Sequence, residues 1–404
     1  MRPARPAAPR RGLAHRAALG LAVLVTVLVP LVAGHAAAPD PRREAHGMAT
    51  ARDADGKTLI FYSAGRRPAP GSSWHHDVVV ARWHDGVLEK PTPFIVREEA
   101  QEPVSVAQAA SGNILVTFED GWDANGSVTQ RYGVYRNTLE EVAPYPREVK
   151  RGGHSGHAAA VGDRFVVVYS DEWIHGGGVD DLGSGFGVYA AVYDAKGEQQ
   201  HTVALADARR EWWPVIAGGG ETAMAVWQRF VPGTRQAALV AAPIDPVSGK
   251  AGGAVVLHPA VNYYTYHVAW LPAIERFLVV GTAGPRGFAR LLDGQGKVQA
   301  ELDCLPPSVR EASIAVAPTA DGDRGAVAFT PVQGGGLMAI QASPQALRAA
   351  GTLDDGRREP WPPNGGVGLF TQRGEIDWFY FMGSDLASRR FAPSAPRGAT
   401  TCRG

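Results

Sequence analysis

The chain has 404 residues with 40 basic and 40 acidic side chains, and nothing in its middle has the composition of a linker between two cores. The balanced charge removes the electrostatic attraction on which nucleic-acid binders rely, so nucleic acid is excluded as a partner. Glycine (49) and proline (30) are frequent while apolar residues still make up 45%, a combination typical of many short strands joined by tight turns.

The first 38 residues have the pattern of a signal peptide. Arginines between Arg2 and Arg16 precede an uncharged run over 17–39, and small residues at 34 and 36–38 offer a cleavage site. Cleavage would leave a short linker at 39–46. We therefore expect a secreted, periplasmic or cell-surface protein with no membrane span after cleavage. An uncleaved anchor is the alternative, because the run is about long enough to cross a bilayer.

The body over 47–393 repeats one pattern of a small-residue strand, a turn, a strongly apolar strand, a polar loop, a third strand and a weaker fourth. The apolar second strands recur at 58–62, 114–118, 165–169, 222–227, 277–281, 325–329 and 376–380. This spacing, about 45 to 60 residues, is that of four-stranded propeller blades. The predicted fold is an all-β, seven-bladed β-propeller, followed by a tail at 394–404.

Turn residues agree with this division into blades. Asp55-Gly56, Gly162-Asp163 and Gly218-Gly219-Gly220 stand between first and second strands, where hairpins need residues that tolerate positive φ. Six blades remain the alternative count, because the last two repeats are short. We expect the first or last blade to combine strands from both chain ends, which would hide the sheet edges.

One repeat carries a resemblance to known proteins. Residues 165–197 consist of an apolar strand, an Asp/Gly loop and the sequence Gly-Val-Tyr-Ala-Ala-Val-Tyr-Asp-Ala-Lys-Gly. This segment is similar to the repeat of secreted bacterial β-propeller proteins, and the resemblance implies a propeller of the sialidase-like kind. The Asp-box of sialidases, Ser-x-Asp-x-Gly-x-x-Trp, is absent from the sequence.

Candidate site residues follow from the repeat, because equivalent positions of different blades share one face of a propeller. Segments that enter the first strands and loops that follow the second strands carry aromatic, acidic and basic side chains, the composition of a polar-ligand pocket. The catalytic candidates are His157, Asp171, Glu172, Tyr266 and His267. The ligand-binding candidates are Glu119, Asp120, Trp173, Trp213 and Arg229.

Each candidate also has a structural interpretation. Trp213 suits packing between blades, the histidines can satisfy backbone groups in the channel, and the acidic residues can be solvated loop charges. The same unusual residue types on several independent loops favour a functional site.

Three functions are compatible with such a site. The sequence favours a monomeric binding module for a glycan or a peptide, because it has no catalytic motif of definite spacing. The first alternative is a glycoside hydrolase or polysaccharide lyase that uses carboxylates or His and Tyr at the same face. The second is a cell-surface scaffold.

No cofactor is predicted, and no metal residue is assigned. The acidic, glycine-rich loop over 171–185 makes bound Ca²⁺ a secondary hypothesis, although the D-x-D-x-D-G spacing is missing. Three histidines, His154, His157 and His175, could alternatively hold a transition metal. Cys304 and Cys402 either form a disulfide or are unrelated thiols.

Overall fold

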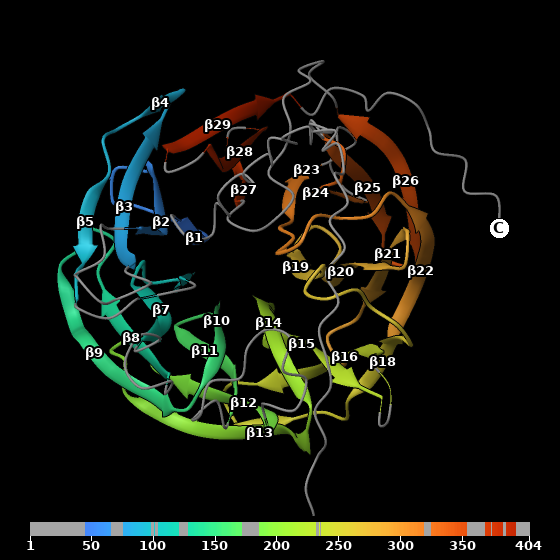
Figure 1. Ribbon diagram of the computed structural model, residues 1–404, viewed down its shortest axis with the longest axis horizontal. Coiled ribbons are helices and arrows are strands. Elements are labelled where there is room, and N and C mark those ends of the chain that lie inside the picture. The colour runs from blue at the N-terminus through green and yellow to red at the C-terminus, as the bar shows by residue number, and fades with distance from the viewer. Residues whose placement is uncertain are drawn as a thin grey trace, which may run out of the picture. The chain divides into compact units, whose positions relative to one another are not determined.

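The computed structural model describes residues 45–65, 76–97, 101, 104–120, 128–171, 186–231, 234, 236–318, 325–353, 368–372, 374–382 and 385–392. The signal-peptide prediction and the tail over 394–404 lie outside these residues. All the regular elements of the described part are strands. They form seven antiparallel sheets arranged as the blades of a ring (Figure 1), which confirms the predicted seven-bladed propeller.

The first four blades each contain four or five strands. Blade one comprises β1 (Ala45–Arg52), β2 (Thr58–Gly65), β3 (His76–His84), β4 (Val87–Leu88) and β5 (Thr92–Ile95). Blade two comprises β6 (Ser105–Gln108), β7 (Ile114–Asp120), β8 (Thr129–Tyr135) and β9 (Glu141–Arg151). Blade three comprises β10 (His154–Val161), β11 (Arg164–Ser170), β12 (Phe186–Tyr193) and β13 (Gln199–Arg209). Blade four comprises β14 (Glu211–Gly219), β15 (Thr222–Phe230), β16 (Ala237–Asp245), β17 (Lys250–Ala251) and β18 (Val255–His258).

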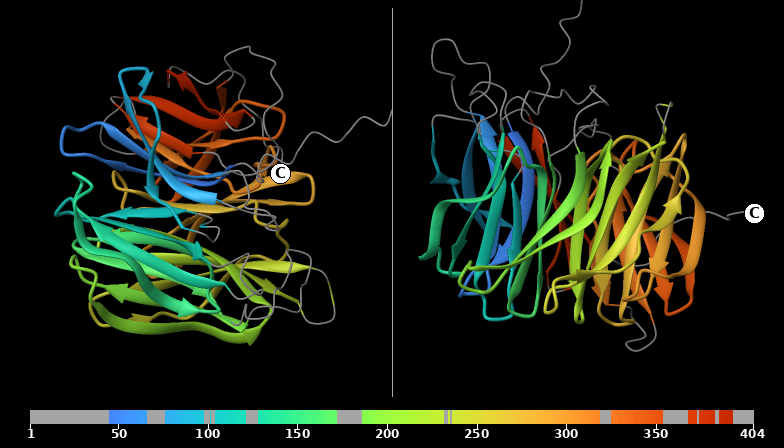
Figure 2. Two further views of the ribbon diagram at one scale, coloured as in Figure 1. Left: turned by 60° about the vertical axis from the view of Figure 1, so that its left-hand side comes forward. Right: turned by 90° about the horizontal axis from the view of Figure 1, so that it is seen from below.

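The last three blades complete the ring. Blade five comprises β19 (His267–Leu271), β20 (Arg276–Ala283), β21 (Arg286–Leu292) and β22 (Val298–Leu305). Blade six comprises β23 (Ala315–Pro318), β24 (Ala326–Pro331), β25 (Leu337–Ser343) and β26 (Ala346–Leu353). Blade seven comprises β27 (Gly368–Gln372), β28 (Glu375–Met382) and β29 (Asp385–Phe391). Figure 2 shows the blades from two further directions.

The second strands are apolar on both faces because each lies between two neighbouring blades. In β11, Phe165, Val167 and Tyr169 join one apolar cluster with residues of blade two. The alternate residues Val166 and Val168 join a second cluster with residues of blade four. Successive side chains of a strand point to opposite faces of its sheet, so an uninterrupted apolar run fills both interfaces. The sequence predicted this strand within one residue at each end.

The ring closes by packing between its first and last blades. The first strands β1, β6, β10, β14, β19, β23 and β27 contact one another in chain order, and β27 contacts β1. The prediction that one blade would combine both chain ends was wrong for the described residues, since each sheet there comes from one continuous stretch of chain. Burial between blades one and seven supplies the closure, as Trp83 of β3 packs edge-on against Phe379 of β28.

One other sequence prediction has a partial outcome. Cys304, in β22, takes part in a disulfide, and Cys402 lies outside the described residues. In the described part of the chain, no helix is long and apolar enough to span a membrane.

Candidate functional site

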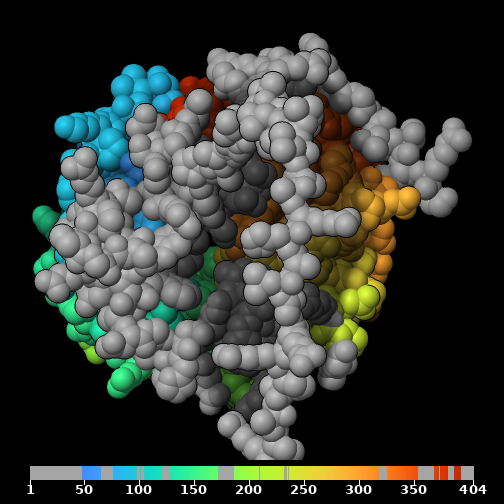
Figure 3. All heavy atoms as spheres, in the orientation of Figure 1, coloured from blue at the N-terminus to red at the C-terminus, as the bar shows by residue number. Residues whose placement is uncertain are grey.

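A cavity of 280 Å³ occupies the centre of the ring, and all seven blades contribute to its wall. Apolar side chains such as Val106, Ala158 and Ile216 line much of it. Its polar side chains come mostly from blades three, five and six: His157, Tyr264, Tyr266, His267, Glu311 and Ser313. An apolar wall with a few convergent polar groups is the usual composition of a ligand pocket. Figure 3 shows one face of the ring around this centre.

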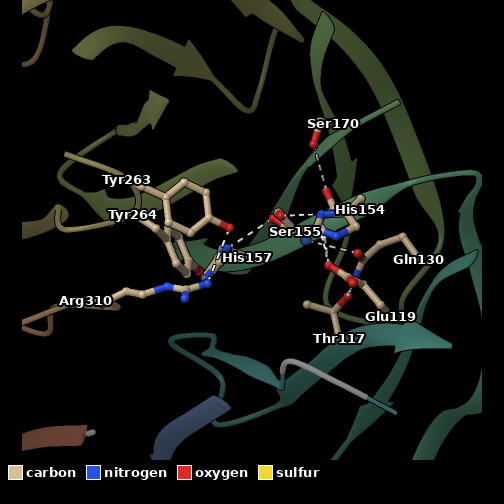
Figure 4. A network of polar contacts seen from close by, with 11 residues as sticks. Thr117, Glu119, Gln130, His154, Ser155, His157, Ser170, Tyr263, Tyr264 and Arg310 are labelled. Carbon is tan, nitrogen blue, oxygen red and sulfur yellow. Dashed lines mark hydrogen bonds and ion pairs between the residues drawn. The ribbon is translucent and has the colours of Figure 1, made fainter. Parts of the chain in front are cut away.

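His157 and Tyr264 form a hydrogen-bonded pair across blade four (Figure 4). Nδ1 of His157 lies 3.1 Å from the carbonyl oxygen of Ser155, so it must carry a proton and donate it. Nε2 then accepts a hydrogen bond from the Tyr264 hydroxyl at 3.0 Å. Burial lowers the pKa of His157 and raises that of Tyr264 well above its ordinary value, which keeps both groups neutral.

His267 begins β19 beside this pair. Burial, helped by the nearby His157, lowers the pKa of His267 to about 4. Its Nδ1 atom has no hydrogen-bond partner among the described residues. The neighbouring Tyr266 is fully buried and donates its hydroxyl hydrogen to the carbonyl oxygen of Trp213. Of these two cavity residues, His267 therefore has hydrogen-bonding capacity left for a ligand.

Glu311 adds a carboxylate on the blade-six side. Its backbone N–H donates to the carbonyl oxygen of Tyr264 at 2.8 Å, which fixes the blade-six segment against blade five. Beside it, the Arg310 guanidinium lies 4.5 Å from the centre of the Tyr263 ring. Among the described residues, Glu311 is the only carboxylate that lines the cavity.

A turn with the same backbone conformation stands next to the cavity in four blades. A non-glycine residue with φ between 52° and 57° precedes the first strand or stands near its start in blades three to six: Ser155, Trp213, Tyr264 and Glu311. The residue two positions later lines the cavity in every case: His157, Val215, Tyr266 and Ser313. Left-handed backbone costs non-glycine residues about 1 kcal/mol or more. Because four blades share it, this geometry belongs to the repeat.

Hydrogen bonds between blades hold the turns at Ser155 and Tyr264 and the segment at Ser308 that leads into blade six, and we call these bonds interblade clamps. In each, a polar side chain on a second strand accepts a backbone N–H of the next blade. The three clamps are Glu119 with Ser155, Gln228 with Tyr264 at 3.1 Å, and Thr282 with Ser308 at 2.9 Å. Glu119 is 1% exposed, and its carboxylate also lies 3.5 Å from Nδ1 of His154.

The sequence-predicted site residues divide into two groups. His157, Tyr266 and His267 meet at the cavity, and Trp213 packs behind it against the Tyr264 ring, with centroids 4.9 Å apart. The described residues Glu119, Asp120, Asp171 and Arg229 do not line the cavity.

Three of these four residues form ion pairs, and Glu119 belongs to an interblade clamp. Asp120 pairs with Arg131 at 3.0 Å and accepts the Tyr145 hydroxyl hydrogen. Asp171 pairs with Lys150 at 3.0 Å, and Arg229 pairs with Glu211 at 2.8 Å. The predicted residues Glu172 and Trp173 lie outside the described residues.

Sequence reasoning did not select Tyr264 or Glu311 as site residues. Both stand in the segments expected to enter blades five and six, two positions before a cavity-lining residue. Aligning these segments on Ser155 of blade three would have identified them.

The described residues contain no group of three or more His, Cys, Asp or Glu side chains placed to hold a metal ion. The loop proposed for Ca²⁺ over 171–185 lies outside the described residues except for Asp171.

Comparisons with known proteins concern the fold. No protein-family model matches the sequence, and no curated protein matches it. The structure is similar to Kuenenia stuttgartiensis hydrazine synthase, with a TM-score of 0.53, 13% identity, and coverage of 89% of this chain and 98% of that one.

Two other solved structures, both of glycosidases, have lower TM-scores. An α-L-arabinofuranosidase of Fusarium graminearum has a TM-score of 0.47 and 12% identity, covering 72% of this chain and 88% of that one. The NanB sialidase of Streptococcus pneumoniae has a TM-score of 0.46 and 9% identity, and the match covers 87% of this chain and 68% of that one. At these identities, what the chain shares with solved structures is the propeller fold.

Proposed function

We propose that this protein is an exported binding module that holds a sugar unit of a glycan in the central cavity. The observation that carries the proposal is the cavity itself, in which neutral hydrogen-bonding groups, His157, Tyr264 and His267, interrupt an apolar wall. Export is supported by the leader over 1–38.

The chemistry of the wall suits a sugar. Sugar hydroxyls donate and accept hydrogen bonds, and a neutral imidazole does the same with its two nitrogens. The apolar wall and the Tyr264 ring can cover the C–H faces of a sugar ring. The volume of 280 Å³ is just below the ~300 to 1,000 Å³ of sites for drug-sized ligands. One monosaccharide unit is therefore the expected occupant, with the rest of the glycan outside.

The test is glycan-array binding of the purified protein, followed by calorimetry with the best ligand. His267→Leu removes the unpartnered imidazole at similar volume and should weaken binding about tenfold or more. His201→Leu, on the outer strand β13, is the matched control and should bind normally. The proposal fails if no glycan binds or if His267→Leu binds as well as the control. Binding of peptides in place of glycans would also overturn it.

A second candidate, a polysaccharide lyase, is favoured by the His157–Tyr264 hydrogen bond. A lyase needs one group to take a proton from the sugar carbon and another to protonate the leaving oxygen. His157 and Tyr264 have these capacities. Hydrolysis by two carboxylates is less well supported, because Glu311 is the only carboxylate lining the described cavity.

Ultraviolet absorbance of unsaturated products would detect lyase activity, and reducing-end assays would detect hydrolysis. If the protein is a lyase, Tyr264→Phe should abolish turnover and leave binding nearly unchanged. Binding without turnover on the same polysaccharides would support the binding module.

A further inference from the structure

Gln130 contacts the peptide unit between Ser155 and Gly156 from the neighbouring blade two. It lies in β8, is fully buried and does not line the cavity. Its side-chain oxygen accepts the Gly156 N–H at 2.9 Å, and its amide nitrogen donates to the Thr117 hydroxyl at 2.7 Å. Glu119, which lies opposite Gln130 in the sheet, accepts the N–H of Ser155. Two neighbouring side chains of blade two thus hold two successive backbone N–H groups of blade three.

Glycine at position 156 is required for this contact. A Cβ atom added at Gly156 would lie 2.0 Å from the Cδ atom of Gln130, closer than any real Cβ contact. The φ angle of Gly156 lies outside the left-handed region, so glycine serves here for close approach rather than for conformational freedom. Gln130 therefore occupies the space that a larger residue at position 156 would fill, and the two residues form one fitted contact.

The contact fixes the direction of the Ser155 carbonyl group. The C=O of Ser155 and the N–H of Gly156 belong to one trans peptide unit, in which they point in opposite directions. Because the N–H points to Gln130, the C=O points away from it and accepts the Nδ1–H of His157 at 3.1 Å (Figure 4). Burial is the main influence on the pKa of His157 and lowers it, and the Ser155 carbonyl opposes this more strongly than the Pro214 carbonyl does.

The tautomer of His157 decides how Tyr264 meets a ligand. With its proton on Nδ1, His157 has a lone pair on Nε2, which takes the hydroxyl hydrogen of Tyr264 at 3.0 Å. The Tyr264 oxygen then has lone pairs but no further hydrogen to donate. Tyr264 lines the cavity, so toward a ligand its hydroxyl group is an acceptor, which matches the O–H group of a sugar.

We propose that Gln130 is a positioning residue that fixes the tautomer of His157 through the Ser155 carbonyl group. The Tyr264 hydroxyl group is thereby an acceptor for one hydroxyl group of the sugar. This inference rests on the proposed glycan binding and adds the hydrogen-bond donor that the ligand must present. Gln130 acts without touching the ligand, because its influence passes through one peptide unit and one imidazole ring.

Nitrogen NMR of isotopically labelled histidine rings tests the tautomer in the unliganded protein. The His157 signals are identified by their loss in His157→Leu. The wild type should carry the proton on Nδ1. Gln130→Met has no acceptor for the Gly156 N–H and should move part of the population to a proton on Nε2. Gln130→Glu keeps an acceptor oxygen and should retain the wild-type tautomer.

Thr282→Val is the matched control, because it removes the buried acceptor of the Ser308 N–H, another interblade clamp. It should destabilise the ring to a similar degree and leave the His157 tautomer unchanged. A proton on Nε2 in the wild type, an unchanged tautomer in Gln130→Met, or an equal change in Thr282→Val would overturn the inference. If Gln130→Met does not fold, Gly156→Ala displaces the Gln130 side chain and replaces it in the test.

Calorimetry relates the tautomer to binding. The probes are the methyl glycosides of glucose, galactose and mannose, with the derivatives of each that lack one ring hydroxyl. In the wild type, removal of the hydroxyl that meets Tyr264 should weaken binding about tenfold or more. In Gln130→Met this difference between parent and derivative should disappear, whereas Thr282→Val should keep it.

The results separate this inference from the proposed function. If a glycoside binds and each of its derivatives binds equally well, the positioning role is wrong and glycan binding stands. The same conclusion follows if Gln130→Met keeps the full difference between parent and derivative. If no glycoside binds, the cavity does not hold a single sugar unit and both proposals fail.

Discussion

The interfaces between blades and the wall of the central cavity use polar residues in opposite ways. At the interfaces, polar groups such as Glu119 and Gln228 accept backbone hydrogen bonds from the next blade. On the cavity wall, His267 retains a ring nitrogen without a partner in the described structure. A buried polar group with a partner stabilises the ring, and one with spare capacity can serve a ligand. Burial alone therefore does not identify a site.

The largest expected effect tests the apolar part of the interfaces. Val167→Asp puts an unpaired carboxylate into a fully buried position of β11, and we expect the free energy of unfolding to fall by about 4 kcal/mol or more. Val247→Asp makes the same change at a side chain that is 61% exposed and should shift stability by less than about 0.5 kcal/mol. Urea denaturation measures both. Equal effects would mean that β11 does not lie between blades.

Acidification tests the protonation state of His267 on the cavity wall. His267 has a pKa of about 4 in the folded protein and an ordinary value of 6.5 when exposed. As the pH falls from 6.5 to 4, the unfolded chain gains a proton that the folded protein does not bind, so stability falls. The expected loss is on the order of 3 kcal/mol, and the lowered pKa of His157 acts in the same direction.

Thermal unfolding at a series of pH values measures this loss. His267→Leu should remove most of the dependence over this range, whereas His201→Leu should retain it. A wild-type melting temperature that stays constant between pH 6.5 and 4 would contradict the neutral state of His267 in the folded protein.

The carboxylate of Glu119, at an interface between blades, can be compared directly with that of Glu311, on the cavity wall. Glu119→Ala leaves the Ser155 N–H without its acceptor and should cost about 2 kcal/mol. Glu311→Ala removes a half-buried wall carboxylate and should cost less than about 1 kcal/mol. Chemical denaturation of both variants gives the difference. If Glu311→Ala proves the more destabilising, Glu311 is an interface residue and the contrast between the two regions fails.

The smallest effect concerns the hydrogen bond between Tyr264 and His157, which joins blades five and three. Tyr264→Phe removes the hydroxyl that donates to His157 and should cost about 1 kcal/mol. Tyr263→Phe is the comparison variant, because its hydroxyl accepts a longer contact, 3.4 Å, from Arg310. The melting temperatures of the two variants provide the measurement. A greater loss in Tyr263→Phe would show that the His157 bridge is not the stronger contact.

The sequence predicted the blades well because their signals are local. An apolar run such as 165–169 and a turn such as Gly162-Asp163 lie within a few residues of each other, and Gly162 has the expected positive φ of 56°. The segments that enter the first strands were found for the same reason. His157, Tyr266 and His267 could therefore be placed together from their positions in the repeat.

The partners of polar residues could not be predicted in this way. Glu119 and Ser155 are 36 residues apart, and His157 and Tyr264 are 107 apart, so each contact depends on how neighbouring blades are oriented. A carboxylate after an apolar strand has the same local pattern whether it binds a ligand or a backbone N–H. For the described residues, closure of the ring was also mispredicted, because blades one and seven are joined there by side-chain packing, which the strand pattern of the sequence does not reveal.

The left-handed turn shared by Ser155, Trp213, Tyr264 and Glu311 has a consequence for how such a protein can change during evolution. At Ser155 and Tyr264 a side chain of the preceding blade accepts the backbone N–H of the turn residue, and in the four blades the turn carries a hydroxyl, an indole, a phenol and a carboxylate. Its side chain can therefore be exchanged while the course of the main chain is kept. Blades three to six thus each offer one variable position near the channel, and a new ligand preference can arise from point substitutions in a ring whose architecture stays constant.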